Sequence, residues 1–159
     1  MNIQDLTING VYDKTSILDT FSINGDLYGV GISPKTNSVV AVYALNSSYN
    51  NRWEDGILKY IRNIQGNDYL HEQNVALLNA ASNQTTIHVF EKSFGEYTYK
   101  GIFISNGDPV IEKDQFNNSE TYCFSLEPVS KEVIPKAIKN PQIDNTDDKM
   151  KLLSVYRTD

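Results

Sequence analysis

Short runs of β-branched and aromatic residues recur along the chain and constrain its fold more than any other feature. Such side chains favour extended backbone because they pack well on a pleated sheet. The runs predict strands over residues 27–32, 39–45, 85–90, 96–104 and 121–126. The last of these runs alternates apolar and polar residues, which is the spacing of a strand with one buried face. In the run at 96–104, Gly101 predicts a bulge or a bend.

Two segments favour helix instead. Asp13 or Thr15 can cap a short helix over residues 16–21, which would end before the turn at Asn24-Gly25. Asp68 can cap a longer helix over residues 69–82, where Ala and Leu favour helical backbone. A strand-rich order with a central helix predicts the α+β class, as a small β-barrel with one or two flanking helices.

The chain has 159 residues, which suits one domain and a tail. The texture of the sequence changes after residue 130, where Pro135, Pro141 and the polar stretch 140–148 interrupt any regular pattern. We interpret residues 1–130 as the domain. Residues 131–159 are interpreted as a C-terminal tail or linker that ends in a short helix.

Charge and composition exclude some classes of protein. Asp and Glu number 20 against 14 Lys and Arg, for a net charge of −6, which excludes a polybasic nucleic-acid binder held by charge alone. A local basic strip is still compatible with this balance. No apolar run is long enough to span a membrane, and the N-terminus does not resemble a signal peptide. A single cysteine cannot form an internal disulfide, so we expect a cytoplasmic protein.

The sequence offers little for catalysis. It contains no P-loop and no dinucleotide-binding glycine pattern, and one cysteine with two histidines leaves little for a zinc site. A nucleophile pair of Cys123 and His88 is conceivable. However, a lone cysteine in an alternating strand is usually a small buried hydrophobe, and His88 fits a solvent-facing or cross-strand role. We therefore expect no enzymatic activity, no metal and no cofactor in this chain.

The segment from residue 49 to residue 63 mixes aromatic, basic and amide side chains. Its aromatic and basic residues are Tyr49, Arg52, Trp53, Lys59, Tyr60 and Arg62, and its amides are Asn50, Asn51 and Asn63. In a loop-rich segment, this mixture suits bases stacked on aromatic rings beside phosphates, with each stacked base worth about 1–3 kcal/mol. The alternative is structural, with Trp53 closing one end of the barrel and Tyr60 in the core of a strand.

Several short motifs follow one another in order along residues 53–126. They are Trp53-Glu54-Asp55-Gly56, Tyr60, Gly66-Asn67-Asp68, Asn74-Val75-Ala76-Leu77, Ile87-His88-Val89-Phe90-Glu91, Tyr97-Thr98-Tyr99-Lys100-Gly101 and Phe124-Ser125-Leu126. In this order of motifs the chain resembles the SRA (YDG) branch of the PUA-like fold. The version in McrA-type modification-dependent restriction endonucleases is the most similar. The resemblance covers about residues 8–130.

The resemblance implies a PUA-like, SRA-like twisted β-barrel that reads modified DNA without catalysis. It would extrude a modified base, such as 5-methylcytosine or 5-hydroxymethylcytosine, from the duplex into an aromatic pocket. By position, the base would be bound by Tyr49, Trp53, Asp55 and Tyr60, with Asp55 facing the base edge. Phosphates would be held by Arg52, Lys59, Arg62 and Asn63. Asn74 is expected to tie the helix to the turn before it.

The chain departs from the family pattern after Tyr60, where Ile61-Arg62 replaces a Thr-Gly pair. A glycine lets backbone approach a ligand closely, so the pocket is expected to differ from that of the family.

The function implied is the specificity module of a bacterial modification-dependent restriction or phage-defence system. Modified double-stranded DNA would be the partner, and any nuclease would lie in another domain or subunit. Two alternatives stay open. One is a PUA-like module that binds RNA or a modified nucleotide, which suits an acidic surface because single strands need fewer phosphate contacts. The other is a protein-interaction module that uses strand 96–104 or the tail.

Overall fold

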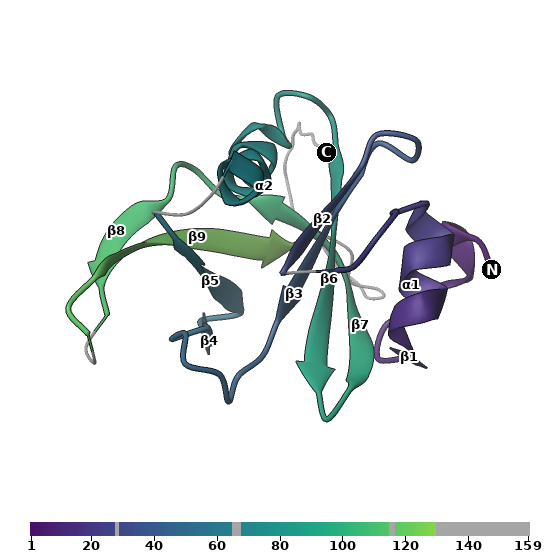
Figure 1. The fold of residues 1–159 in the computed structure, drawn as a ribbon, viewed down its shortest axis with the longest axis horizontal. Coiled ribbons are helices and arrows are strands. Elements are labelled where there is room, and N and C mark those ends of the chain that lie inside the picture. The colour runs from purple at the N-terminus through teal and green to yellow at the C-terminus, as the bar shows by residue number, and fades with distance from the viewer. Residues whose placement is uncertain (28, 65–67, 115–116, 130–159) are drawn as a thin grey trace. The chain divides into compact units, whose positions relative to one another are not determined.

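The computed structural model describes residues 1–27, 29–64, 68–114 and 117–129, and their strands pair into one nine-stranded sheet (Figure 1). The features below belong to the unit Met1–Glu127. Residues 131–159, for which the sequence predicts a tail or linker with a short helix, lie outside the described residues, as do Gly66 and Asn67.

The strands form a continuous path with two short additions. In spatial order the path runs through β2 (Val30–Ser33), β3 (Ser38–Tyr43), β6 (Thr86–Ser93), β7 (Glu96–Ser105), β9 (Glu120–Pro128), β5 (Ile57–Asn63) and β4 (Arg52–Glu54). The additions are β1 (Val11–Tyr12), which pairs with β7, and β8 (Val110–Lys113), which pairs with β9. β3 and β6 run parallel, so the segments that follow these two strands leave from the same end of the sheet.

The predicted barrel is not confirmed, because within the described residues the two ends of the strand order, β2 and β4, do not pair with each other. A side-chain contact, and not backbone pairing, connects β5 to β3 across the curled sheet. The hydroxyl of Tyr60 on β5 donates to the carbonyl oxygen of Val42 at 2.9 Å and approaches that of Gly29 at 3.2 Å. The sheet therefore curls enough for β5 to face β3, and it stays open along its edges.

Removing this hydroxyl gives a stability test of the curled sheet. We expect Tyr60→Phe to lower the free energy of unfolding by about 1 kcal/mol, because a buried hydrogen bond is lost without loss of volume. Urea denaturation measures the change. Tyr122→Phe is the matched control, since the Tyr122 hydroxyl makes no hydrogen bond within the described residues. Equal effects of the two substitutions would contradict a bridging role for Tyr60.

Two helices cover opposite faces of the sheet. α1 (Lys14–Phe21) begins after Asp13, whose carboxylate accepts from the Ser16 backbone N–H at 2.8 Å, as the sequence predicts. A single 3-10 turn, η1 (Ile3–Asp5), precedes it. α2 (Asp68–Asn79) begins one residue before the predicted start, so Asp68 is its first residue and not its cap, and it ends three residues before the predicted end. Along β3, Val39 and Ala41 belong to the core cluster that contains α2 residues, whereas Val40 belongs to the cluster that contains α1 residues.

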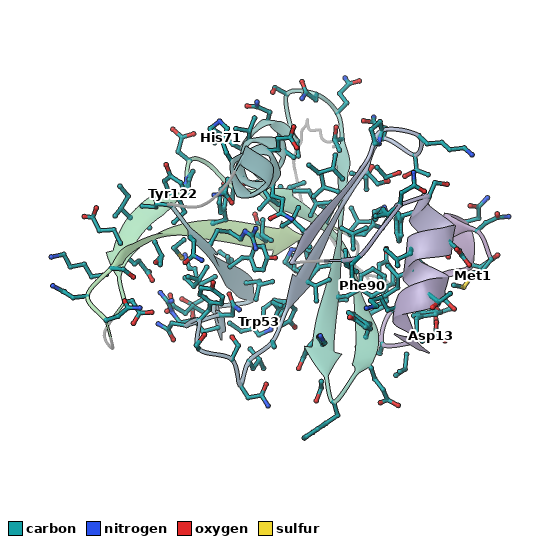
Figure 2. The ribbon with its side chains drawn as sticks, viewed as in Figure 1. Met1, Asp13, Trp53, His71, Phe90 and Tyr122 are labelled. Carbon is teal, nitrogen blue, oxygen red and sulfur yellow. The ribbon has the colours of Figure 1, made fainter. Side chains whose placement is uncertain are left out.

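A bulge in β7 lets that strand contribute to both faces. Val89 pairs with Gly101 and Phe90 pairs with Tyr99, so Lys100 has no partner across the ladder. Gly101 has a φ of 104°, a conformation that favours glycine, which confirms the bulge predicted there. Tyr99 and Phe90 consequently pack on the side of α1, where Figure 2 shows Phe90.

Candidate functional site

The segment that carries most of the predicted site residues is a β-hairpin and not a loop. Glu54 pairs with Ile57, so Asp55 and Gly56 form a two-residue turn between β4 and β5. Both turn residues have positive φ angles, 52° and 79°, as a type I′ turn requires. Asp-Gly is a strong hairpin signal, which the loop-rich interpretation of the sequence overlooked. Asp55, predicted to face the base edge, is exposed at this turn and is not among the residues that line the cavity described below.

Strand alternation divides the predicted site between two faces. Because successive side chains of a strand point to opposite faces, residues two apart lie together. Trp53, Tyr60 and Arg62 lie on the face of the main core, which also receives Leu58. The opposite face carries Arg52, which pairs with Lys59, and further along β5 it carries Ile61 and Asn63. The hairpin therefore does not gather its aromatic and basic side chains into one pocket.

Two of the predicted base-binding aromatics have structural contacts. Tyr60 is 2% exposed in the core and offers no free ring face in this conformation. Trp53 packs at the edge of the same core, where its indole N–H donates to the hydroxyl of Tyr43 at 3.2 Å (Figure 2). Its ring centroid lies 5.9 Å from that of Phe103. Tyr60 thus lies in the core of a strand, the structural role that the sequence left open for it, whereas Trp53 packs at the edge of the core of an open sheet and not at the end of a barrel.

A cavity of about 390 Å³ lies on the opposite face of the hairpin. Its lining comes from four parts of the chain: the loop after β3, then β5, β8 with the residue after it, and β9. The residues are Leu45, Ser47, Ser48, Tyr49, Asn50, Asn51, Ile61, Glu112, Lys113, Asp114 and Thr121. Of the eight predicted site residues only Tyr49 lines this cavity, while Arg52 and Asn63 contact lining residues.

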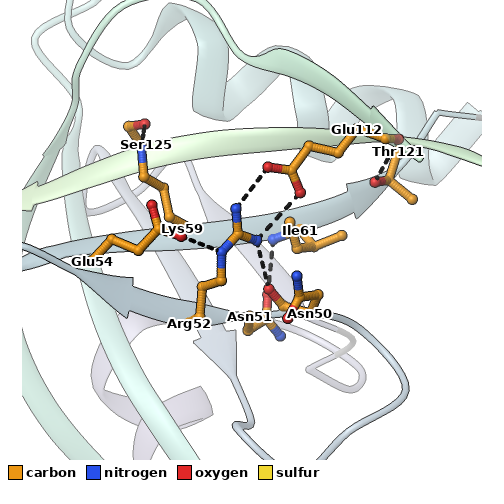
Figure 3. Close-up of polar contacts among 9 residues, drawn as sticks. All are labelled: Asn50, Asn51, Arg52, Glu54, Lys59, Ile61, Glu112, Thr121 and Ser125. Carbon is orange, nitrogen blue, oxygen red and sulfur yellow. Dashed lines mark hydrogen bonds and ion pairs between the residues drawn. The ribbon is translucent and has the colours of Figure 1, made fainter. Parts of the chain in front are cut away.

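Amide side chains fix the loop that covers the cavity. The carboxamide oxygen of Asn51 accepts from the backbone N–H of Ile61 at 2.8 Å (Figure 3). The carboxamide nitrogen of Asn51 donates to the Ala44 carbonyl at 3.3 Å. Asn63, predicted to hold phosphate, donates from its side chain to the hydroxyl of Tyr49 at 2.7 Å. The Tyr49 ring, 37% exposed, is therefore held in place with part of its surface open.

Arg52 connects the hairpin to the far wall of the cavity. Its guanidinium contacts the carboxylate of Glu112 at 2.7 Å and that of Glu54 at 2.6 Å, and it donates to the Asn50 carbonyl at 3.0 Å (Figure 3). The hydrogen bond from Arg52 lowers the pKa of Glu112, so this carboxylate is ionised at neutral pH. Arg52, predicted to hold phosphate, is thus paired with two acids, and Glu112 brings a negative charge to the cavity.

The remaining predicted phosphate contacts are also engaged. Lys59 donates to the hydroxyl of Ser125 at 2.9 Å. Arg62 donates to the side chains of Gln73 and Asn74 on α2, at 3.2 Å for Asn74. Asn74 in turn donates to the Asn63 carbonyl at 2.9 Å, which confirms that it ties the helix to the preceding segment.

The histidine and the cysteine considered as a nucleophile pair have different neighbours. His88 is buried between the rings of Phe21 and Tyr99, and its Nδ1 lies 2.8 Å from the Tyr99 hydroxyl. Burial lowers the pKa of His88 to about 4. Cys123 neighbours Glu112, and burial raises the pKa of its thiol to about 11, so the thiol is protonated at neutral pH. This is the buried hydrophobe that the strand pattern predicts.

Two features are absent from the part of the chain that the structure describes. No cluster of three or more His, Cys, Asp and Glu side chains there is placed to hold a metal ion. No helix there has the length and apolar character to cross a bilayer.

No protein-family model and no curated protein matches the sequence. Solved structures match the fold. The modification-dependent restriction endonuclease AspBHI aligns with a TM-score of 0.62 and 10% identity over 79% of this chain and 42% of AspBHI. The SUVH5 SRA domain in complex with hemi-methylated CG DNA aligns with a TM-score of 0.59 and 15% identity, over 86% of this chain and 94% of that one. KRYPTONITE in complex with mCHG DNA and SAH aligns with a TM-score of 0.55 and 15% identity, over 79% of this chain and 32% of the KRYPTONITE chain.

The chain therefore has an SRA-like fold, as the order of motifs predicts. It spans nearly the whole SUVH5 SRA chain but less than half of AspBHI or KRYPTONITE. The comparisons therefore concern one domain of those larger proteins.

The sequence did not point to the far wall of the cavity. Glu112, Lys113, Asp114 and Thr121 come from β8, β9 and the residue after β8, about sixty residues after Arg52. Strand pairing brings them close to β5, because Thr121 on β9 pairs with Asn63 on β5 on one side and with Glu112 on β8 on the other. No local motif marks them, because their role depends on which strands become neighbours.

Proposed function

We propose that this chain is a non-catalytic reader of modified DNA, and that it holds an extruded modified base in the cavity beside Tyr49. The observation that carries the proposal is a cavity of about 390 Å³ next to a fixed, partly open aromatic ring, in an SRA-like fold. Solved structures of this fold include SUVH5 SRA domains bound to fully methylated and fully hydroxymethylated CG DNA. A base must leave the duplex to be read on all its edges, and such a cavity can receive it.

The chemistry of the cavity suits a cytosine-like base. Tyr49 offers a ring for stacking, and Glu112 offers a charged acceptor for an exocyclic amino group. At about 30 Å³ of liquid volume per water, the cavity would hold roughly a dozen waters, which leaves room for a substituent on the base. Lys113 is an exposed residue of the cavity lining and can contact a phosphate, a role that the sequence assigned to other residues.

The chain would then supply the sequence or modification specificity of a restriction or phage-defence system, with the nuclease in another domain or subunit. AspBHI supports this arrangement, since the match covers 42% of a modification-dependent restriction endonuclease. The rest of that enzyme is outside the aligned part.

Fluorescence anisotropy with matched oligonucleotides tests the proposal. We expect the chain to bind a duplex with 5-methylcytosine or 5-hydroxymethylcytosine at least tenfold more tightly than the plain duplex, with affinity that falls as salt rises. Equal binding to plain and modified duplexes would contradict it. Preference for single-stranded RNA would favour the RNA-binding alternative, which the net charge of −6 supports. Absence of nucleic-acid binding at low salt, with a mass that rises with concentration, would favour a protein-interaction module.

A further inference from the structure

Phe94 is the most exposed large apolar side chain among the described residues. It lies in the turn that joins β6 to β7 and is 97% exposed. The strands stay paired up to that turn, with Lys92 opposite Tyr97 and Ser93 opposite Glu96. Phe94 therefore stands at the end of a paired hairpin, where its position is set by strands and not by a long loop.

The backbone at this turn makes a phenylalanine unfavourable. Phe94 has a φ of 52° and Gly95 has a φ of 81°, so both turn residues are in the left-handed region. Asn, Asp or Gly usually occupies the first position of such a turn, because a bulky side chain is strained at positive φ. At 97% exposure Phe94 gains little from packing in the fold, so the strain of a phenylalanine at this φ is the observation that points to a role in binding.

The β6–β7 turn and the loop that lines the candidate cavity lie at the same end of the sheet. β3 and β6 are parallel neighbours, and Tyr43 at the end of β3 pairs with Glu91 on β6. Past this pair, β3 continues into the loop that lines the cavity, while β6 runs two more residues to the turn (Figure 1). Phe94 thus lies at the same end of the sheet as the loop that carries Tyr49.

We propose that Phe94 is a wedge that inserts between stacked bases of the duplex whose modified base is held in the cavity. The inference rests on the proposed function. Extruding a base leaves its neighbours unstacked, and an aromatic ring inserted at that place restores stacking. Ser93 and Gly95 on either side are small, so the ring can enter the base stack without a clash from its neighbours. Lys92, whose amine lies 5.7 Å from the centroid of the Tyr97 ring, adds a positive charge close to the tip.

The test uses two substitutions at Phe94 and two forms of DNA. Phe94→Ala and Phe94→Asn are expected to weaken binding to the modified duplex by about 10- to 100-fold. Binding to the same modified base in a single strand should barely change, because a single strand has no stack to open. Asn suits the left-handed turn, so Phe94→Asn should also raise the melting temperature while it lowers affinity. Leu78→Ala, which removes an exposed apolar side chain from α2, is the control and should bind as the unchanged protein does.

2-Aminopurine placed beside the modified base reports unstacking directly. Its fluorescence should rise when the unchanged protein binds and should rise less with either Phe94 variant. Unchanged duplex affinity in both variants, or an equal loss on duplex and single strand, would overturn the wedge while the base pocket stands. If the unchanged protein shows no preference for the modified duplex, the proposed function fails, and the wedge fails with it.

Discussion

Tyr49→Ala is expected to abolish the preference for modified over plain duplex DNA, whereas Trp53→Ala is expected to keep that preference and to lower stability. The two rings have the same exposure, 37%, so exposure alone does not separate them. Their surroundings do. Tyr49 lines the cavity, while Trp53 packs on Tyr43 and Phe103 at the edge of the core.

The size of each effect follows from what the ring contacts. Loss of a stacking surface for one base is worth about 1–3 kcal/mol, which is about a 5- to 150-fold loss of affinity for the modified duplex. Loss of the partly exposed indole should lower the free energy of unfolding by about 2–3 kcal/mol, less than for a fully buried Trp.

Competition anisotropy measures the preference, and urea denaturation measures the stability of each variant. Tyr49→Phe is the matched control, since it keeps the ring and loses only the hydroxyl that accepts from Asn63. If Trp53→Ala loses the preference at unchanged stability, the base is held on the core side of the hairpin, as the resemblance implies. If Tyr49→Ala keeps the preference, the cavity does not hold the base.

The sequence predicted the central strands from two different patterns. β3 and β6 are buried on both faces, so their β-branched and aromatic runs are nearly continuous, whereas β7 and β9 alternate buried and more exposed residues. β5 was less evident because only one of its faces is in the main core, and Lys59 and Asn63 interrupt its pattern. Closure of the sheet could not be predicted locally, since it depends on whether strands far apart in sequence meet at their edges.

The candidate site was predictable only in part, for a related reason. The segment near residue 50 was correctly singled out, and Tyr49 does line the cavity. The side chains beside it were assigned from spacing in a loop. In a hairpin, the strict alternation of faces sends Tyr60 and Arg62 away from Lys59 and Ile61. Glu112 reaches the site through pairing of β8 with β9, which leaves no mark near residue 50.

Acid is expected to destabilise the protein through His88, in a window from about pH 6.5 down to about pH 4. Burial lowers the pKa of His88 from 6.5 to about 4, since the charged ring would lie between Phe21 and Tyr99. Between these two values the unfolded chain binds a proton that the folded chain does not bind. Unfolding is therefore favoured as the pH falls, and stability is constant above about pH 6.5 as far as His88 is concerned.

The loss over the whole window should reach about 3 kcal/mol, at a slope of up to about 1.4 kcal/mol per pH unit. Urea denaturation across pH 4 to 8 measures this slope. Asp13 and Glu112 also have lowered pKa values, so their stabilising hydrogen bonds are lost only at the acid end of the range, as they become protonated. His88→Gln keeps a polar partner for the Tyr99 hydroxyl but cannot titrate. This variant should be less stable at neutral pH and nearly flat between pH 5 and pH 6.5. A slope that persists there would show that another group takes up the proton.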